Sequence, residues 1–335
     1  MIERFGKDFD YSAIKRDVEW RRQTAKERGR DARKLAMNMS EINCPVCGGS
    51  NAAPVQWIYN MEYKRCQTCD LVYLPEIPNA EKLKSIYVDT IDKLEKAPGD
   101  DLYNTDDFEN RVTLICQPKV AFVLEHSRIP DPVWIDIGCG IGDLVMAANR
   151  AGCSAKGYDI DEREITHGMK HGANVEQCDV TVQNAADLLG ASDVISLISV
   201  LEHIPDCASS LEMLVSSAKA EAQFVIEVPR FNSLSSLVNI NFPELVSRHM
   251  MPPNHVMLFT DKAFEHLLDR AGLEAEAAWF YGSDVNELLG NLALADVGNN
   301  FEFENLLPLL NELQAVVDKA KFCDEMLVVC KKKQK

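Results

Sequence analysis

Three glycines near the middle of the chain could bring the backbone against a ligand. Residues 133–143 read VWIDIGCGIGD, with glycines at Gly138, Gly140 and Gly142. The apolar run predicts a buried strand, and residues 144–150 predict a helix after the turn. Glycine has no Cβ, so the backbone can bend sharply there and approach a ligand at the helix N-terminus. Asp136, just before the turn, would repel a pyrophosphate by like charge, which favours a cationic ligand.

Further acidic residues end the apolar stretches that follow. Asp159 lies in SAKGYDI (residues 154–160), at about the 20-residue spacing at which a doubly wound sheet holds ribose hydroxyls. Asp179 lies in NVEQCDV (residues 174–180), and the next stretch reads DVISLISVLEHIPD (residues 193–206). These stretches predict the second, third and fourth strands of a parallel sheet.

These four motifs, taken in order, resemble those of class I S-adenosylmethionine-dependent methyltransferases. The resemblance implies an α/β fold with a seven-stranded, Rossmann-like core. It also implies that the cofactor, which carries a sulfonium and an amino group, is bound by residues from all four motifs: Asp136, Gly138, Gly140, Gly142, Asp159, Ile160, Asp179, Val200 and Glu202. The alternative is a nucleotide-binding α/β domain of another kind, because a fold does not fix a function.

Four of the eleven cysteines have the spacing of a metal site. Cys44 and Cys47 form one CxxC pair, and Cys66 and Cys69 form another. Each pair can present two thiolates to one ion, and the spacing is typical of a tetrahedral zinc site with no open position, which is structural. An iron site or two disulfides are the alternatives. Residues 55–65 alternate like a hairpin, and the other seven cysteines are expected to be small core residues.

The segment after the cysteines extends the resemblance. A zinc ribbon, then DLVYLPEIPNAEKL (residues 70–83), then a class I core is similar to a bacterial group of sugar and polysaccharide-locus methyltransferases. That group includes C-methyltransferases acting on nucleotide-linked deoxysugars. The resemblance covers about residues 41–280.

Two histidines are candidates for a catalytic base. His203 follows the fourth strand, and His255 matches the histidine of the sugar C-methyltransferase segment. Asn254 and Pro252 stand where that segment has Glu and Tyr, so O- or N-methylation is comparably expected. A hydrogen-bonded structural role is the alternative for both histidines. Three basic residues of the following loop could bind a substrate phosphate or simply face solvent: Arg230, Arg248 and His249.

Composition narrows the classes of function. The chain has 335 residues and a formal net charge of −17, which argues against a general nucleic-acid binder. It has neither an 18-residue apolar run nor a signal-peptide core at its N-terminus, so a cytoplasmic protein without a membrane span is expected. Residues 11–36 are basic and predict a helix that packs on an acidic surface or, alternatively, a docking arm for an anionic partner.

The expected organisation has four parts. Residues 1–40 form a basic helical extension, 41–80 the zinc ribbon, 81–130 a helical connector, and 131–335 the methyltransferase domain. Within that domain, residues 230–258 form a lid and residues 284–321 a helical insertion. Three further strands are expected at 222–229, 273–281 and 325–330. Thr260 and Asp261 can cap a helix that Gly272 ends.

The favoured function is methyl transfer to a small acceptor, with or without a phosphate, such as a sugar, a nucleotide-linked sugar or a polysaccharide precursor. A methyltransferase acting on RNA or protein and a catalytically idle cofactor-binding scaffold are the alternatives. The acidic composition counts against the first alternative, and the intact glycine turn with Asp136 and Asp159 counts against the second. The sequence names neither the methylated atom nor the oligomeric state.

Overall fold

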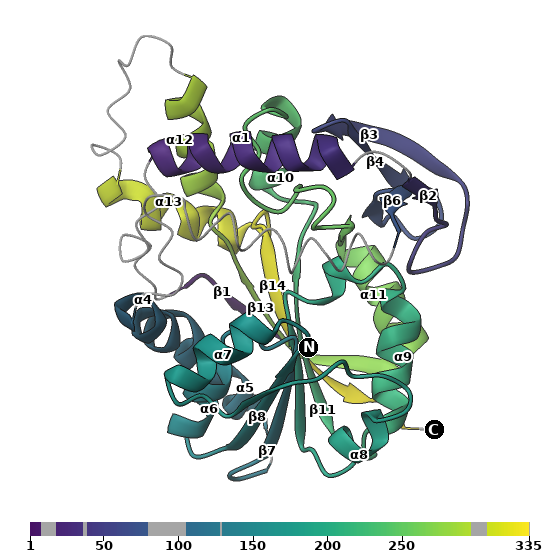
Figure 1. Cartoon of the computed structure of the whole chain (residues 1–335), viewed down its shortest axis with the longest axis vertical. Coiled ribbons are helices and arrows are strands. Elements are labelled where there is room, and N and C mark those ends of the chain that lie inside the picture. The colour runs from purple at the N-terminus through teal and green to yellow at the C-terminus, as the bar shows by residue number, and fades with distance from the viewer. Residues whose placement is uncertain (8–17, 36–38, 80–104, 128, 296–306, 335) are drawn as a thin grey trace.

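A central sheet of eight strands organises the molecule (Figure 1). The computed structural model describes residues 1–7, 18–35, 39–79, 105–127, 129–295 and 307–334. The strand order is β1-β13-β14-β11-β10-β7-β8-β9, and only β14 runs antiparallel to its neighbours. The strands are β1 (Ile2–Phe5), β7 (Val133–Ile137), β8 (Ser154–Asp159), β9 (Val175–Gln177), β10 (Val194–Ile198), β11 (Gln223–Pro229), β13 (Leu273–Tyr281) and β14 (Glu325–Lys332).

Seven of these strands form the expected class I core, in which the last strand is inserted antiparallel between the fifth and sixth. The predicted Rossmann-like α/β fold is therefore confirmed. The eighth strand, β1, was not predicted. It pairs in parallel with β13 and extends the edge of the sheet, within a segment expected to be only helical. Four residues with no alternating pattern give little local signal for a strand.

Helices cover both faces of the sheet (Figure 1). One face carries α4 (Thr105–Asn110), a π-helical turn (η2, Arg111–Cys116), α5 (Gln117–His126), α6 (Asp143–Arg150) and α7 (Glu162–Lys170). The other carries α8 (Ala185–Leu189), α9 (Cys207–Ser217) and α11 (Asp261–Ala271). Successive strand residues point to opposite faces, so Phe224 and Ile226 pack in one core and Val225 packs in the other. Thr260 caps α11 and Gly272 ends it in the left-handed conformation, as predicted.

The cysteine-containing segment forms a second, small sheet. Its order is β12-β5-β4-β3, with β3 (Ala52–Ile58), β4 (Met61–Cys66), β5 (Val72–Tyr73) and β12 (Met257–Leu258). The predicted hairpin is β3–β4, and its turn residues Tyr59 and Asn60 both have positive φ, at 47° and 68°. A separate pair joins β2 (Met39–Glu41) to β6 (Glu76–Pro78). Because β12 lies in the expected lid, the lid contributes a strand to the ribbon sheet.

The remaining helices lie above the carboxyl edge of the central sheet (Figure 1). They are α1 (Val18–Leu35), α10 (Leu234–Asn241), α12 (Asp284–Ala295) and α13 (Leu307–Lys319). The basic helix α1 packs on α12, where Arg21 and Glu287 form a buried ion pair at 2.9 Å. It also contacts the lid, because Arg28 donates to the carbonyl of Ser247. In the described part of the chain, no helix is both long enough and apolar enough to cross a bilayer.

Candidate active site

The glycine turn between β7 and α6 has the conformation that the sequence suggested. Gly138, Gly140 and Gly142 all have positive φ, between 51° and 76°. A Cβ on Gly138 would lie 2.6 Å from Cγ2 of Val200, and one on Gly142 would lie 2.6 Å from Cγ1 of Val175. A side chain is therefore unfavourable at both positions for two reasons: the backbone has a positive φ, and a neighbouring side chain occupies the space that a Cβ would need.

A buried carboxylate, Asp136, and a half-buried one, Asp159, flank this turn. Trp134 donates its indole N–H to the hydroxyl of Ser196 at 2.8 Å, and that hydroxyl donates to Oδ1 of Asp136. Asp159, at the end of β8, accepts from the backbone N–H of Gly140 at 2.8 Å and of Asp161 at 2.9 Å. These hydrogen bonds fix both carboxylates at the carboxyl edge of the parallel strands, where open α/β sheets bind their ligands.

Burial changes the acid–base behaviour of both groups. It raises the pKa of Asp136 to about 7, against the lowering effect of the Ser196 hydrogen bond. Burial also raises the pKa of Asp159. A bound cation would offset this cost by favouring the charged carboxylates, so the turn is suited to a ligand that carries positive charge.

A cavity of about 480 Å³ opens beside the glycine turn. Its walls come from the turn, the helices before β7, the ends of β10, β11 and β13, the lid, and the start of α12. The aromatic side chains Trp279 and Tyr281 and the apolar residues Leu114 and Ile115 contribute to the lining. A cavity of this size at a strand edge can hold a small molecule.

Among the described residues, the lining of this cavity contains five basic side chains and six carboxylates, and two of the basic side chains share Glu325. Each basic side chain of the described lining is in an ion pair with a carboxylate; the pairs are Lys7–Glu325, Arg21–Glu287, Arg111–Asp143, Lys119–Glu227 and Arg248–Glu325. Glu227 also accepts from the hydroxyl of Tyr281. Because these cations are already neutralised, the described lining offers no dedicated site for a phosphate.

The residues expected to bind the adenosine half lie at an open rim. Ile160 is 37% exposed, and Asp179 is exposed at the end of β9. Neither lines the 480 Å³ cavity. Val200 lies against Gly138, where its side chain occupies the space that a Cβ would need.

Three expected site residues come together outside the cavity lining. Glu202 and His203 belong to the 3₁₀ turn after β10 (η3, Leu201–His203), and His255 comes from the lid. The rings of His203 and His255 lie 4.7 Å apart, nearly perpendicular to one another. Burial, together with His203 and His249 nearby, holds the pKa of His255 well below its ordinary range, so its ring is neutral at pH 7. The sequence analysis placed Glu202 at the cofactor and the two histidines at the acceptor, and it predicted neither their association nor their separation from the cavity.

The basic loop residues have structural partners. Arg230 is 1% exposed and donates to Asp261 and to the carbonyls of Lys321 and Cys323. It therefore neither faces solvent nor reaches the cavity. His249 lies 3.3 Å from the carboxylate of Asp324. Of the three, only Arg248 lines the cavity.

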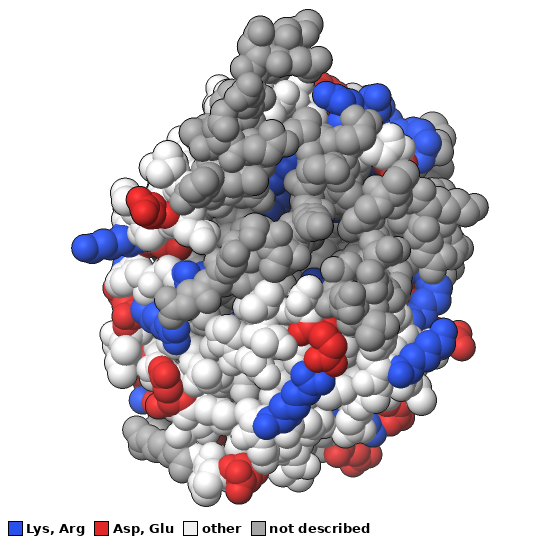
Figure 2. Space-filling view, turned by 90° about the vertical axis from the view of Figure 1, so that its left-hand side faces the viewer, with Lys and Arg blue, Asp and Glu red and all other residues white. Residues whose placement is uncertain are grey.

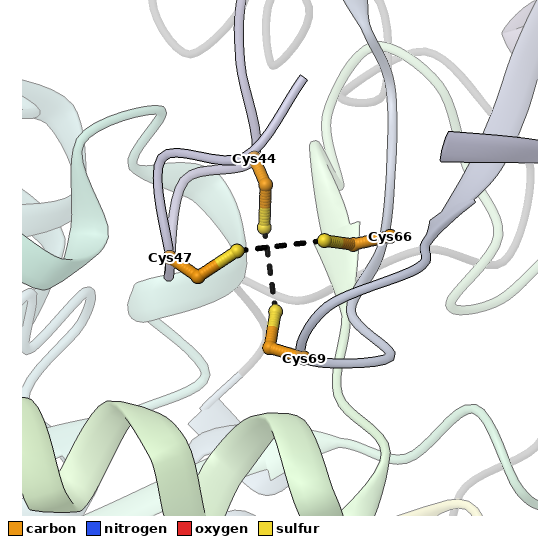
Figure 3. Close-up of side chains that lie close together, drawn as sticks. All are labelled: Cys44, Cys47, Cys66 and Cys69. Atoms are coloured by element: carbon orange, nitrogen blue, oxygen red, sulfur yellow. Dashed lines mark hydrogen bonds between the residues drawn. The ribbon is translucent and has the colours of Figure 1, made fainter. Parts of the chain in front are cut away.

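The four cysteines of the CxxC pairs converge as a tetrahedral metal site requires (Figure 3). The Sγ atoms of Cys44 and Cys69 are 3.4 Å apart, and those of Cys47 and Cys66 are 3.5 Å apart. Tetrahedral Zn–S bonds place sulfurs about 3.8 Å apart, so a small expansion would admit the ion. Six of the seven other cysteines are buried, as expected, and Cys178 is partly exposed.

Several cavity residues were not identified from the sequence. Tyr281 ends a predicted strand and Glu227 lies two residues before the end of another, so the rule that ligands bind at carboxyl edges could have found them. Lys119 lies in a predicted helix, and its pairing with Glu227 across 108 residues has no local signal. The same is true of Lys7 and Arg21, which reach the cavity from the N-terminal segment.

Comparison with known proteins agrees with the fold and the glycine turn. The family described as methyltransferase domain matches residues 108–278, about half of the chain, and the chain belongs to it. The protein is thus an S-adenosylmethionine-dependent methyltransferase. It is 26% identical to a ubiquinone biosynthesis O-methyltransferase of Hahella chejuensis, over 57% of this chain and 83% of that protein. It is 28% identical to the same enzyme of Bordetella avium, over 48% of this chain and 63% of that protein.

Solved structures give more distant likenesses. The magnesium protoporphyrin IX methyltransferase of Synechocystis PCC 6803, solved with bound S-adenosylhomocysteine, has a TM-score of 0.49 and 14% identity. That comparison covers 76% of this chain and all of the other. The 1,6-didemethyltoxoflavin-N1-methyltransferase of Burkholderia thailandensis has a TM-score of 0.46 and 13% identity, covering 84% of this chain and all of the other.

Proposed function

We propose that the enzyme methylates a hydroxyl group of a small, uncharged acceptor held in the 480 Å³ cavity. The observation that carries this proposal is the pairing of every described basic residue of the lining with a carboxylate. An anionic acceptor would have to break one of these ion pairs, and two of them, Arg21–Glu287 and Lys119–Glu227, are almost fully buried. A neutral molecule with hydroxyl groups can instead hydrogen-bond to the paired side chains without disrupting them.

The cofactor residues in this proposal are those around the glycine turn. S-adenosylmethionine supplies a methyl group on a sulfonium, which is already a good leaving group. Asp136 and Asp159 would provide negative charge to the cationic part and hydrogen-bond acceptors to the ribose, while Gly138 lets the backbone approach closely. Ile160 and Asp179 would contact the adenine at the open rim, and Val200 and the turn before Glu202 would border the methionine part.

Two classes of acceptor hydroxyl are in question. The zinc-ribbon arrangement and the motifs similar to sugar-locus methyltransferases favour a sugar or a polysaccharide precursor, and the ion-paired lining favours an uncharged one over a nucleotide-linked sugar, whose diphosphate is anionic. The ion-paired, hydroxyl-rich lining, which includes Ser199, Ser247 and Ser283, supports a sugar ring of this kind. A phenolic hydroxyl is the second candidate, favoured by the relatives named for ubiquinone biosynthesis and by Trp279 and Tyr281.

In this proposal, the rate of methyl transfer comes from positioning the acceptor hydroxyl in line with the methyl group of the cofactor. His203 and His255 do not line the cavity, and Glu227 is already engaged by Lys119 and Tyr281. Holding an acceptor in line with a good leaving group can contribute about 7–11 kcal/mol to lowering the barrier without a dedicated base. We therefore assign the cavity residues to orientation, and the histidine base remains a prediction to be tested.

The ribbon is proposed to hold one structural zinc ion through Cys44, Cys47, Cys66 and Cys69. Four thiolates leave no open position for a reacting molecule. The role of the ribbon is then to support the lid, which donates β12 to its sheet. The face drawn in Figure 2 shows Lys and Arg side chains interspersed with Asp and Glu among its described residues, an arrangement unlike the basic surface of a nucleic-acid reader.

An acceptor panel with labelled S-adenosylmethionine tests this function. One arm contains neutral sugars, a second contains catechol-type phenols, and a third contains nucleotide-linked sugars, which are phosphorylated. Product mass and fragmentation identify the methylated oxygen. Label transfer to a hydroxyl of a neutral acceptor supports the proposal. Transfer only to phosphorylated acceptors, to nitrogen, or to RNA or protein would contradict it.

A further inference from the structure

A second cluster of metal-ligating side chains lies where the end of β10 meets the lid. One ligand atom from each of Glu202, His203 and His255 lies within 4.8 Å of the others. Two come from the 3₁₀ turn after β10, and the third comes from the lid about 50 residues later in the chain. The cluster is separate from the four cysteines and does not line the active-site cavity.

The carboxylate of Glu202 lacks the partners that a buried charge requires. The residue is 1% exposed, and neither carboxylate oxygen has a hydrogen-bond partner in the described structure. Its nearest basic atom is Nε2 of His203, at 4.0 Å. An uncompensated carboxylate at this depth is costly, and buried carboxylates are normally paired, hydrogen-bonded or bound to a metal. A cation bound next to Glu202 would therefore stabilise its charged carboxylate.

The two histidines are arranged as ligands rather than as a hydrogen-bonded pair. Nδ1 of His203 lies 2.8 Å from the carbonyl of Asn254. Nε2 lies on the side of Glu202, and a carbonyl contact at one ring nitrogen commonly orients an imidazole that binds a metal through the other. Nδ1 of His255 is buried and has no hydrogen-bond partner. The ring of His255 is also held in place, because Tyr63 donates to its backbone carbonyl at 2.6 Å.

We propose that Glu202, His203 and His255 bind one divalent transition-metal ion, in addition to the ion in the cysteine site. Two imidazoles and one carboxylate are the donors that zinc, cobalt and iron(II) accept, whereas magnesium and calcium prefer oxygen ligands throughout. Metal–nitrogen and metal–oxygen bonds of about 2.0–2.2 Å place donor atoms roughly 3–3.5 Å apart, so donors that lie within 4.8 Å of one another would close in by about 0.5–1.5 Å through side-chain rotation. Three protein ligands leave at least one position for water.

This ion would join the lid to the end of β10, so it extends the proposed function without depending on the acceptor. The site also gives His255 a role that excludes general-base catalysis, because a metal-bound nitrogen cannot take a proton. Without a metal, His203 could instead donate to both the Asn254 and Ser199 carbonyls as an imidazolium, with Glu202 as its counter-ion. Metal content distinguishes these arrangements.

The experiment measures bound metal in the full chain, which needs no knowledge of the acceptor. Purified protein is incubated with excess Zn²⁺ or Co²⁺, dialysed, and analysed for metal per chain. Two ions per chain are expected. In the cobalt form, the cysteine site gives thiolate-to-cobalt charge-transfer bands, whereas the second ion adds only ligand-field bands of nitrogen and oxygen donors.

Conservative variants assign the second ion. Glu202→Gln and His255→Gln should each lose one ion while the thiolate bands persist. The control His167→Gln, a buried histidine on α7, should retain both ions. If one variant fails to fold, as judged by circular dichroism, the other decides. A wild-type chain that binds a single ion with thiolate bands overturns the proposal. So do two ions in both folded variants. Neither result bears on the proposed methyl transfer.

Discussion

The lid is held by the ribbon through a small number of buried hydrogen bonds, and one of them can be removed cleanly. Tyr63 is fully buried on β4, and its hydroxyl donates to the carbonyl of His255 at 2.6 Å. Tyr59 donates similarly to Val246 at 2.6 Å, and the backbone of Leu74 donates to Val256 at 2.8 Å. Tyr63→Phe removes the hydroxyl and preserves the ring.

The free-energy cost of this substitution comes from the carbonyl of His255, which loses its hydrogen-bond donor. A buried carbonyl deprived of its donor costs about 1–3 kcal/mol. If that cost falls on the closed lid, local opening becomes roughly 5- to 150-fold more populated, since about 1.4 kcal/mol corresponds to a factor of ten. The effect should be confined to the segment that the ribbon holds, because the central sheet keeps its own hydrogen bonds.

Native-state hydrogen exchange measures this opening directly. Peptides covering residues 246–258 should exchange faster in Tyr63→Phe by that factor, while peptides from β10 and β11 should not change. Tyr73→Phe is the matched control, since it makes the same change on the neighbouring strand β5, where the described structure shows no hydrogen bond from the hydroxyl. Unchanged exchange in the lid of a folded Tyr63→Phe protein, or equal acceleration in Tyr73→Phe, would refute the idea that the ribbon anchors the lid.

Four further outcomes are expected. Two variants should each weaken S-adenosylmethionine binding at least tenfold, about 1.4 kcal/mol, as measured by calorimetry: Asp159→Ala, which removes the proposed ribose partner, and Gly138→Val, whose side chain would collide with Val200. Unchanged affinity in both variants would rule out the proposed cofactor site. Because the pKa of Asp136 is raised to about 7, cofactor affinity should fall as the pH drops below 7, and Asp136→Asn should flatten this profile. Since that pKa exceeds the ordinary 3.8, the same carboxyl stabilises the cofactor-free fold at low pH, and this contribution should be lost as the pH rises through about 7 in thermal melts. His255→Ala should lower turnover by less than the roughly 10²–10⁴ that loss of a general base causes, because placement supplies the rate, and a loss in that range would instead identify His255 as the base.

Much of the fold and part of the site could be predicted from local patterns. Apolar runs marked the central strands β10 and β11, which are buried on both faces and need no partner to be recognised, whereas β8 and β9 are partly exposed and were located by the motifs that end in Asp159 and Asp179. The glycines at 138, 140 and 142 were informative because their positive φ values are a local backbone requirement. The CxxC pairs were informative because a knuckle brings two thiolates together by itself.

Tertiary structure decided everything that depends on long-range pairing. β1 is a strand only because the edge of β13 is available to it, and its four residues carry no pattern of their own. The lid became part of the ribbon sheet through β12, although nothing in its sequence shows which edge it meets. The ion pairs of the cavity could not be predicted from the sequence, because Lys119 and Glu227 are 108 residues apart and Arg21 and Glu287 are 266 residues apart. Local sequence spacing determines which side chains one strand, turn or knuckle brings together. The residues around the acceptor instead come from distant segments, and which of these segments pack against one another depends on the whole chain.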